Sequence, residues 1–268
     1  MEEALQQGLP AQQLREIGAS LHQALVRRQA VAPLTERWPA LSIDDAYRIQ
    51  LAMVQHRLDA GERVIGKKIG VTSKVVMDML DVRQPDFGHL LSGMVYPDGA
   101  AIEAATLIAP KAEGEIAFVL KEDLAGPGVT NADVLRATAF VLPCFEIVDS
   151  RIRDWKIRIQ DTVADNASSG VFVLGDAAVD PRGLDLGTVG MTLEKNGEIV
   201  ATGAGAAALG HPANAVAWLA NTLGRLGIAL KAGEVILSGS LAAMVPVQAG
   251  DQLRISLGGV GSAGVRFV

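Results

Sequence analysis

The spacing of apolar residues divides the chain into a helical first part and a β-rich remainder. Apolar residues first recur at intervals of three and four, which is typical of one face of an amphipathic helix; they are Leu14, Ile17, Leu21, Ala24 and Leu25. A second helix is predicted to begin after Ser42, whose hydroxyl suits the N-cap position, and to end at Gly61. We therefore expect residues 1–61 to form a helical N-terminal region.

From residue 62 onward, short runs rich in β-branched residues alternate with Gly, Pro, Asn and Asp, which is typical of strands and turns. The predicted strands are 63–71, 100–108, 112–120, 139–148, 170–175, 189–195, 198–202, 234–238, 251–257 and 262–268. Helices are predicted at 74–80 and 213–226, and Asn196-Gly197 between two apolar runs predicts a two-residue hairpin turn. Residues 62–268 are therefore expected to form a mostly antiparallel, mixed β-domain.

Composition excludes several classes of protein. The chain has 268 residues, 49% of them apolar and 20% charged, which fits one large globular domain or one domain with an appendage. A net charge of −6 without a basic run argues against nucleic-acid binding. The N-terminus lacks the pattern of a signal peptide, and no long uncharged apolar stretch predicts a membrane span. The single Cys144 excludes an internal disulfide and favours a cytoplasmic location.

Other motifs argue against familiar active sites. Gly203-Ala-Gly205 resembles part of a dinucleotide-binding fingerprint, but it follows a hairpin and no suitable acid follows it. A closely packed Gly/Ala turn is the better interpretation. The four histidines have no metal-ligand spacing, and there is no phosphate-binding loop.

Three glutamates interrupt stretches that otherwise have the pattern of buried strands. Glu113 and Glu115 lie two residues apart in a predicted strand, so both point to the same face. Glu146 lies within the apolar run 140–148. Adjacent carboxylates repel, and a buried unpaired carboxylate is costly, so a hard divalent cation would relieve both problems. Oxygen-only ligands favour magnesium, manganese or calcium over zinc. The alternative is a solvated edge strand with Glu146 paired to an arginine.

A lysine flanked by glycines is a second candidate site residue. In the predicted strand 65–71, Lys68 shares one face with Gly66 and Gly70, whereas Lys67 points to the other face. The glycines would leave open space around the Lys68 ammonium, so an anionic ligand could approach it. The alternative is an ordinary surface lysine.

Three turn-like segments carry further polar candidates. Asp86 lies in Gln84-Pro-Asp-Phe-Gly88, a predicted turn, where it would either cap the turn or act as a general acid or base. The segment 163–170 supplies amide, carboxylate and hydroxyl groups, and 237–241 supplies hydroxyl groups; these would either stabilise turns or form hydrogen bonds with a ligand.

Several of these segments also carry a family resemblance. The motifs are Lys68-Ile-Gly-Val-Thr-Ser-Lys74, Gln84-Pro-Asp-Phe-Gly88, Ala112-Glu-Gly-Glu-Ile-Ala117, Phe145-Glu-Ile-Val-Asp-Ser-Arg151 and Ala164-Asp-Asn-Ala-Ser168. Together they resemble the 2-oxopent-4-enoate hydratases, also called 2-hydroxypenta-2,4-dienoate or vinylpyruvate hydratases. These enzymes belong to the fumarylacetoacetate hydrolase superfamily and act in catechol meta-cleavage.

The resemblance implies an α+β fold, in which a mixed β-roll or barrel of the fumarylacetoacetate hydrolase C-terminal type over residues 62–268 follows the helical region. It implies a cytoplasmic, metal-dependent hydro-lyase that uses Mg²⁺ or Mn²⁺ and converts a small 2-hydroxy-dienoate into 4-hydroxy-2-oxopentanoate. The implied partners are further copies of the chain, in a homo-oligomer, and the decarboxylase of the same pathway. The implied site residues are the metal ligands Glu113, Glu115 and Glu146, the catalytic residues Asp86 and Lys68, and the substrate-binding residues Lys68, Ser168 and Ser240.

Three alternatives remain at this point. The 4-oxalocrotonate decarboxylases resemble this chain in fold and glutamate triad, but that family lacks the acid at the position of Asp86. Decarboxylation needs only an electron sink, whereas hydration also needs a group that activates water, so Asp86 favours the hydratase. A non-catalytic keto-acid-binding protein would share the triad without turnover. A carbon–carbon hydrolase would need a His–Glu pair, for which the histidine positions give no support.

Overall fold

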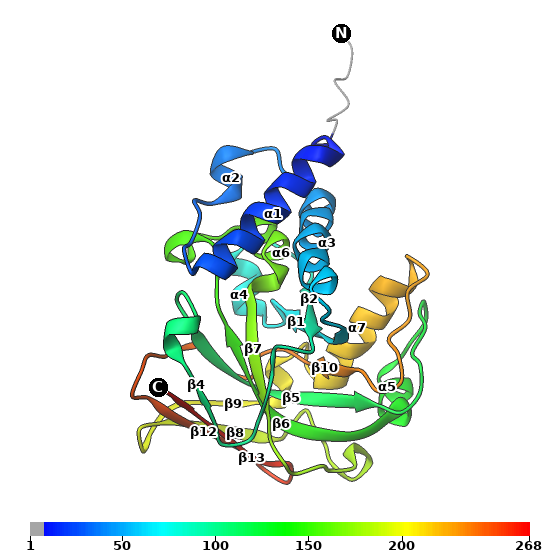
Figure 1. The fold of residues 1–268 in the computed structure, drawn as a ribbon. Helices are drawn as coiled ribbons and strands as arrows, with labels where there is room; N and C mark the ends of the chain where they lie inside the picture. The colour runs from blue at the N-terminus through cyan, green and yellow to red at the C-terminus, as the bar shows by residue number, and fades with distance from the viewer. Residues whose placement is uncertain (1–7) are drawn as a thin grey trace.

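The N-terminal helices gather at one end of the molecule and the two β-sheets lie at the other (Figure 1). The computed structural model describes residues 8–268. The first seven residues lie outside this range; they belong to the predicted helical region 1–61 and to the N-terminus that lacks the pattern of a signal peptide. The first helices are α1 (Ala11–Arg27), α2 (Leu34–Arg37) and α3 (Ile43–Asp59). The predictions of α1 and α3 are confirmed, and the Asp45 N–H donates to the Ser42 hydroxyl at 3.0 Å. The short α2 was not predicted.

The N-terminal helices share their core with a later segment. Leu14 and Ile17 of α1 and Ile49 of α3 pack in one apolar cluster with Ile159 and Val163. These last two residues belong to α6 (Ile159–Ala164), which lies under α1 and α3 (Figure 1). Residues from both parts of the chain therefore form this core. The proposed division into a helical region 1–61 and a β-domain 62–268 stays a prediction.

The larger sheet has eight strands and carries most of the candidate site residues. Its order is β2-β1-β10-β5-β6-β7-β3, and β11 pairs with β5. The strands are β1 (Val64–Gly70), β2 (Asp86–Leu91), β3 (Val95–Pro97), β5 (Lys111–Leu120), β6 (Thr138–Val148), β7 (Ser169–Leu174), β10 (Val235–Leu237) and β11 (Val245–Pro246). The antiparallel pair of β5 and β6 lies near the middle, so residues on its two faces are covered from both sides.

The smaller sheet packs against one face of the larger one. Its order is β4-β13-β12-β8-β9, with bounds Ala100–Ile102, Gly261–Phe267, Gln252–Leu257, Gly190–Lys195 and Glu198–Ala204, respectively. The predicted hairpin at Asn196-Gly197 joins β8 to β9, and both residues have positive φ, as a type I′ turn requires. Ile116, Phe118 and Phe145 fill the space between the sheets. Neither sheet closes into a barrel within residues 8–268, so the α+β roll is confirmed and the closed barrel is not found.

Three elements differ from the sequence predictions. The predicted turn at 84–88 is wrong, because Asp86 is the first residue of strand β2 and pairs with Gly70. The predicted strand 100–108 ends at Ile102, after which a short 3₁₀ turn follows. The segment 163–170 contains the end of α6, a tight turn and the start of β7.

The remaining helices flank the larger sheet. Helix α4 (Lys74–Met79) and α7 (Pro212–Gly224) confirm the predictions, and α5 (Asn131–Ala137) was missed. Within the described residues, no helix combines the length and the apolar character needed to cross a membrane.

Candidate active site

The three glutamates converge on one face of the β5–β6 pair. The register places Glu113 opposite Glu146 and Glu115 opposite Cys144, so these four side chains share a face. Gly114 points the other way, toward the smaller sheet. One carboxylate oxygen from each glutamate lies within 4.8 Å of the other two. Glu115 and Glu146 are fully buried, and Glu113 is partly exposed.

The triad is only partly satisfied. The Gly239 N–H donates to Glu115 Oε2 at 2.8 Å, and Glu146 Oε2 faces the Lys68 ammonium, but Glu115 Oε1 and Glu146 Oε1 have no polar partner within residues 8–268. Burial, reinforced by the neighbouring glutamates, raises the pKa of Glu113 to about 7 and that of Glu115 well above its ordinary value. Buried oxygens without partners and with mutual repulsion are what a hard divalent cation would stabilise.

Lys68 is the cation nearest the triad. Its Nζ lies 3.1 Å from Glu146 Oε2 and donates to the Ala167 carbonyl at 3.0 Å. Burial disfavours the charge, but the carboxylates of Glu146 and Asp86 outweigh it and raise the pKa of Lys68. An ammonium has three N–H donors, so one donor remains beyond these two contacts. Lys67 points to the opposite face and forms an ion pair with Glu234 at 2.7 Å.

The two glycines beside Lys68 do not leave the open space that the sequence predicted. A Cβ on Gly66 would meet the Val235 carbonyl oxygen at 1.9 Å, so that side is filled by backbone. A Cβ on Gly70 would meet Asp86 Oδ1 at 2.3 Å and Lys68 Nζ at 3.4 Å. Gly70 is therefore needed because the Asp86 carboxylate occupies the space that a side chain would take.

Asp86 is buried beside Lys68 at the edge of the cavity. It is 2% exposed, and its Oδ1 has no hydrogen-bond partner within residues 8–268. Burial raises the pKa of Asp86 to about 6, with the Lys68 ammonium opposing this shift and Glu146 adding to it. A carboxyl group with a pKa near neutrality can exchange protons at working pH.

A left-handed turn positions the carbonyl that contacts Lys68. Asn166, Ala167 and Ser168 have φ values of 53°, 50° and 52°, an uncommon conformation for non-glycine residues. The Asn166 side chain accepts from the His89 N–H at 2.8 Å and donates to the His89 carbonyl at 2.9 Å. Three consecutive residues in this region store backbone strain, which persists only where surrounding contacts hold it.

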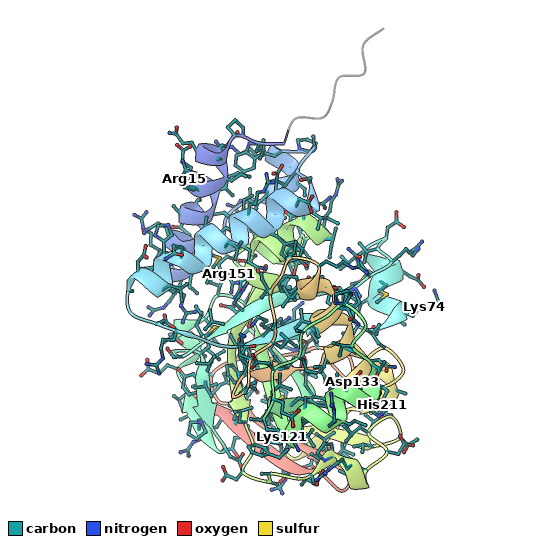
Figure 2. All side chains as sticks on the ribbon, turned by 90° about the vertical axis from the view of Figure 1, so that its right-hand side faces the viewer. Arg15, Lys74, Lys121, Asp133, Arg151 and His211 are labelled. Carbon is teal, nitrogen blue, oxygen red and sulfur yellow. The ribbon has the colours of Figure 1, made fainter. Side chains whose placement is uncertain are left out.

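A buried arginine supplies those contacts. Arg151 is 1% exposed and lies inside the molecule, between the helices and the sheets (Figure 2). Its Nε donates to Asp165 Oδ1 at 2.5 Å, and its other nitrogens donate to the carbonyls of Asp149, Asp165 and Ser169. The Arg151–Asp165 pair thus fixes both ends of the turn that contains Ala167.

A cavity of about 600 Å³ lies above the triad and contains the predicted polar groups. Its polar lining residues include Lys68, Asp86, Glu113, Ser168 and Ser240. The Ser168 hydroxyl lies 3.3 Å from that of Thr162, and the Ser240 hydroxyl donates to the Ala242 carbonyl at 2.7 Å. The structure therefore brings together every residue that the sequence singled out, while their roles remain proposals.

Sequence reasoning missed several residues of this site. Arg151 had no assigned role, and Asp165 was considered only as one polar group of the segment 163–170, although charged residues in apolar surroundings are a usable signal. Gly239, whose N–H contacts Glu115, gave no signal beyond a turn. Lys111 and Trp155, which also line the cavity, were not considered.

Comparisons with known proteins agree on one family. Residues 64–268 match the fumarylacetoacetate (FAA) hydrolase C-terminal family. The 2-hydroxyhexa-2,4-dienoate hydratase of Comamonas testosteroni is 60% identical over 252 residues, covering 93% of this chain and 96% of the relative. The 2-hydroxypent-2,4-dienoate hydratase of Pseudomonas putida is 66% identical over 217 residues, covering 81% and 98%.

A solved structure matches the whole fold. The 4-oxalocrotonate decarboxylase from Pseudomonas putida G7, complexed with magnesium and adipate, superposes with a TM-score of 0.95. Its sequence is 37% identical, and the match covers 98% of this chain and 100% of the decarboxylase.

Proposed function

The chain belongs to the fumarylacetoacetate hydrolase family, and we propose that its buried carboxylate site hydrates 2-hydroxypenta-2,4-dienoate in the meta-cleavage pathway of aromatic catabolism. The enzyme is a hydro-lyase whose product is 4-hydroxy-2-oxopentanoate. The observation that carries this proposal is the placement of Asp86, a buried carboxyl group without a partner on Oδ1, beside Lys68 and the glutamate triad.

The reaction requires two proton transfers to carbon and one addition of water. Protonation at carbon five, with loss of the proton of the 2-hydroxyl group, converts the dienol into an α,β-unsaturated ketone. Water then adds at carbon four, and carbon three takes up a proton. The site must therefore hold the substrate carboxylate and 2-oxygen, stabilise negative charge on that oxygen, and supply a group that moves protons.

The protein uses a divalent metal ion, and the glutamate triad fits this role. Glu113, Glu115 and Glu146 offer oxygen ligands only, and the buried Glu115 Oε1 and Glu146 Oε1 lack partners within residues 8–268. We propose Mg²⁺ or Mn²⁺, the hard ions that such ligands favour, and the related decarboxylase binds magnesium. When bound, the ion supplies Lewis acidity and a template for the carboxylate and 2-oxygen.

Charge stabilisation, proton transfer and substrate binding are assigned to side chains of the cavity. Lys68 is held by Glu146 and the Ala167 carbonyl, so its third N–H is directed by fixed contacts and can stabilise charge on the substrate. Asp86 accepts a proton from the attacking water, because its pKa of about 6 leaves it mostly ionised at neutral pH. Ser168 and Ser240 line the cavity and are proposed to donate hydrogen bonds to the substrate.

The decarboxylase remains the second candidate because its fold matches so closely. Identity favours the hydratases, at 60% and 66% against 37% for the decarboxylase. A single assay separates the two functions. The dienoate absorbance should decrease, and 4-hydroxy-2-oxopentanoate should form, only when magnesium or manganese is present. The six-carbon 2-hydroxyhexa-2,4-dienoate should be assayed beside it, and absence of the hydroxy-oxo acid from both reactions would contradict the proposed function.

Replacing Lys68 with alanine should raise KM and lower kcat, by about 10²–10³-fold in kcat, because a fixed donor to the developing charge is lost. Lys67→Ala is the matched control, since the adjacent side chain points to the other face. It should leave kcat unchanged but cost about 1–3 kcal/mol of stability, because Glu234 loses its ion-pair partner and keeps only the hydrogen bond from the Lys231 N–H. Equal kinetic losses in the two variants would show that Lys68 has no special role.

Two further proposals concern association and location. A homo-oligomer is supported by the edge strand β9, where Ile199 and Val200 are 61% and 45% exposed. A complex with the pathway decarboxylase would pass the dienol directly from one site to the next. Sedimentation of the protein alone and with the decarboxylase tests both. A cytoplasmic location is supported only by the free Cys144.

A further inference from the structure

One cation in the cavity has no assigned task. Lys111, the first residue of β5, points to the same face as Glu113 and Glu115 and is partly exposed. Lys68 and Lys111 are the two lysines that line the cavity within the described residues. Lys68 is engaged by Glu146 and Ala167, whereas Lys111 forms no ion pair with residues 8–268.

The position of Lys111 is fixed by an aromatic support. Its Nζ lies 4.2 Å from the centre of the Trp155 ring, within the range of a cation–π contact. The Trp155 indole N–H donates to the Ala109 carbonyl at 2.9 Å, and the Ala109 N–H donates to the buried Asp149 carboxylate at 2.7 Å. The ring is thereby anchored to the segment that immediately precedes β5. A cation–π contact uses the face of the ring and leaves the ammonium N–H donors available to a ligand.

The spacing between Lys111 and the triad suits a short dicarboxylate. The Cα atoms of Lys111 and Glu113, two residues apart on β5, are separated by about 7 Å, which is close to the length of a five- or six-carbon dicarboxylate. The residues of α4 that line the cavity, Val75, Val76 and Met79, are apolar and could not hold a second carboxylate. A second negative group in this cavity would therefore be stabilised at Lys111.

We propose that Lys111, supported by Trp155, forms a second anion subsite that binds the distal carboxylate of dicarboxylic 2-oxo acids. The active site would then accept dicarboxylates in addition to the monocarboxylic dienoate. This inference rests on the proposed function in one respect, namely that the 2-oxo acid end of the ligand is held at the glutamate triad.

Two probes of equal chain length test the subsite. 2-Oxoglutarate and 2-oxopentanoate share the 2-oxo acid end and differ in whether the other end is a carboxylate or a methyl group. In the wild-type holoenzyme, the Ki of 2-oxoglutarate should be at least about tenfold lower than that of 2-oxopentanoate, which is the effect of one charge-assisted contact. Lys111→Met, which keeps the length of the stem, should remove this preference and change the Ki of 2-oxopentanoate by less than about twofold.

Three further variants sharpen the comparison. Lys121→Met is the matched control, because Lys121 follows the other end of β5 and does not line the cavity; it should leave both Ki values unchanged. Trp155→Phe should keep most of the preference for 2-oxoglutarate, whereas Trp155→Leu should lose part of it, because only the first retains an aromatic face.

The outcomes separate this subsite from the metal site. Equal Ki values for the two probes in the wild type, or a preference that survives Lys111→Met, would overturn the subsite. An equal rise of both Ki values in Lys111→Met would also overturn it, since Lys111 would then serve the 2-oxo acid end or the triad. By contrast, calorimetric binding of 2-oxopentanoate that does not depend on magnesium would contradict the proposed metal site. The preference for 2-oxoglutarate would still be measurable in that case.

Discussion

Replacing Glu115 with glutamine should abolish both metal binding and turnover. Glutamine keeps the shape of the side chain, and its carbonyl oxygen can still accept the hydrogen bond from the Gly239 N–H. The substitution removes one negative charge and one anionic oxygen from the triad. Loss of an outer-shell partner alone costs metal affinity about 10–100-fold, so loss of a direct ligand should exceed this range.

Three measurements check this prediction. Calorimetric titration with magnesium should show binding to the wild type and none to Glu115→Gln at the same concentrations. Exhaustive EDTA treatment should inactivate the wild type, and added magnesium or manganese should restore it. Glu122→Gln, an exposed substitution just beyond β5, is the control and should behave as wild type. Full activity after EDTA treatment would exclude the triad as a metal centre.

The metal-free protein should also become less stable as pH rises. Burial, with repulsion from Glu146, raises the pKa of Glu113 to about 7 from 4.5, and the pKa of Glu115 also rises. The folded state therefore binds more protons than the unfolded state between these values. The free energy of unfolding is highest below about pH 4.5 and falls as pH rises through about 7. Magnesium should offset this loss, because a ligand at 100 times its Kd adds about 2.7 kcal/mol. Thermal unfolding with and without magnesium would measure both effects.

The sequence was most informative where local rules act alone. Strand periodicity was enough to place Glu113 and Glu115 on one face, and to separate Lys67 from Lys68, because alternation follows from backbone geometry. Helix α3 could be predicted from its apolar spacing and the Ser42 cap for the same reason. The family resemblance added Asp86 and Ser168, which no local pattern distinguishes from turn residues.

Contacts between distant segments account for what was missed. Asp86 lies in a strand because Gly70, sixteen residues earlier, pairs with it and leaves space for its carboxylate. Helix α6 has six residues and depends on Asp161, which accepts hydrogen bonds from the N–H and hydroxyl of Thr35, 126 residues away. The left-handed turn at Ala167 likewise depends on Arg151. Such pairings are set by tertiary packing, and local propensity does not contain them.

The missed helix α5 is a different case, because its signal was present in the sequence. The Asp133 N–H donates to the Thr130 hydroxyl at 3.3 Å, while the Asp133 carboxylate accepts from the Thr130 N–H at 2.9 Å. A threonine followed three residues later by an acid is a capping-box pattern. Seven residues gave too little apolar periodicity to predict the helix by spacing alone.

Replacing Asp86 with asparagine should lower the hydration rate by about 10²–10⁴-fold, the usual cost of removing a general acid or base. Asparagine has the same size and can fill the space beside Gly70, but it cannot carry a proton. Magnesium affinity should be nearly unchanged, because Asp86 is separate from the three converging glutamates. Asp81→Asn is the matched control, since Asp81 lies in the preceding turn and its side chain is 94% exposed.

The pH dependence gives an independent measure of the same role. Because Asp86 must be ionised to accept a proton from water, kcat/KM of the wild type should fall as pH drops below about 6, the pKa of this carboxyl group. The residual activity of Asp86→Asn should lack that decline. The wild type should also release no carbon dioxide from 2-oxo-3-hexenedioate at a rate comparable to hydration. Rapid carbon dioxide release with negligible hydration would instead assign the chain to the decarboxylases, and Asp86 would then have only a structural role beside Gly70.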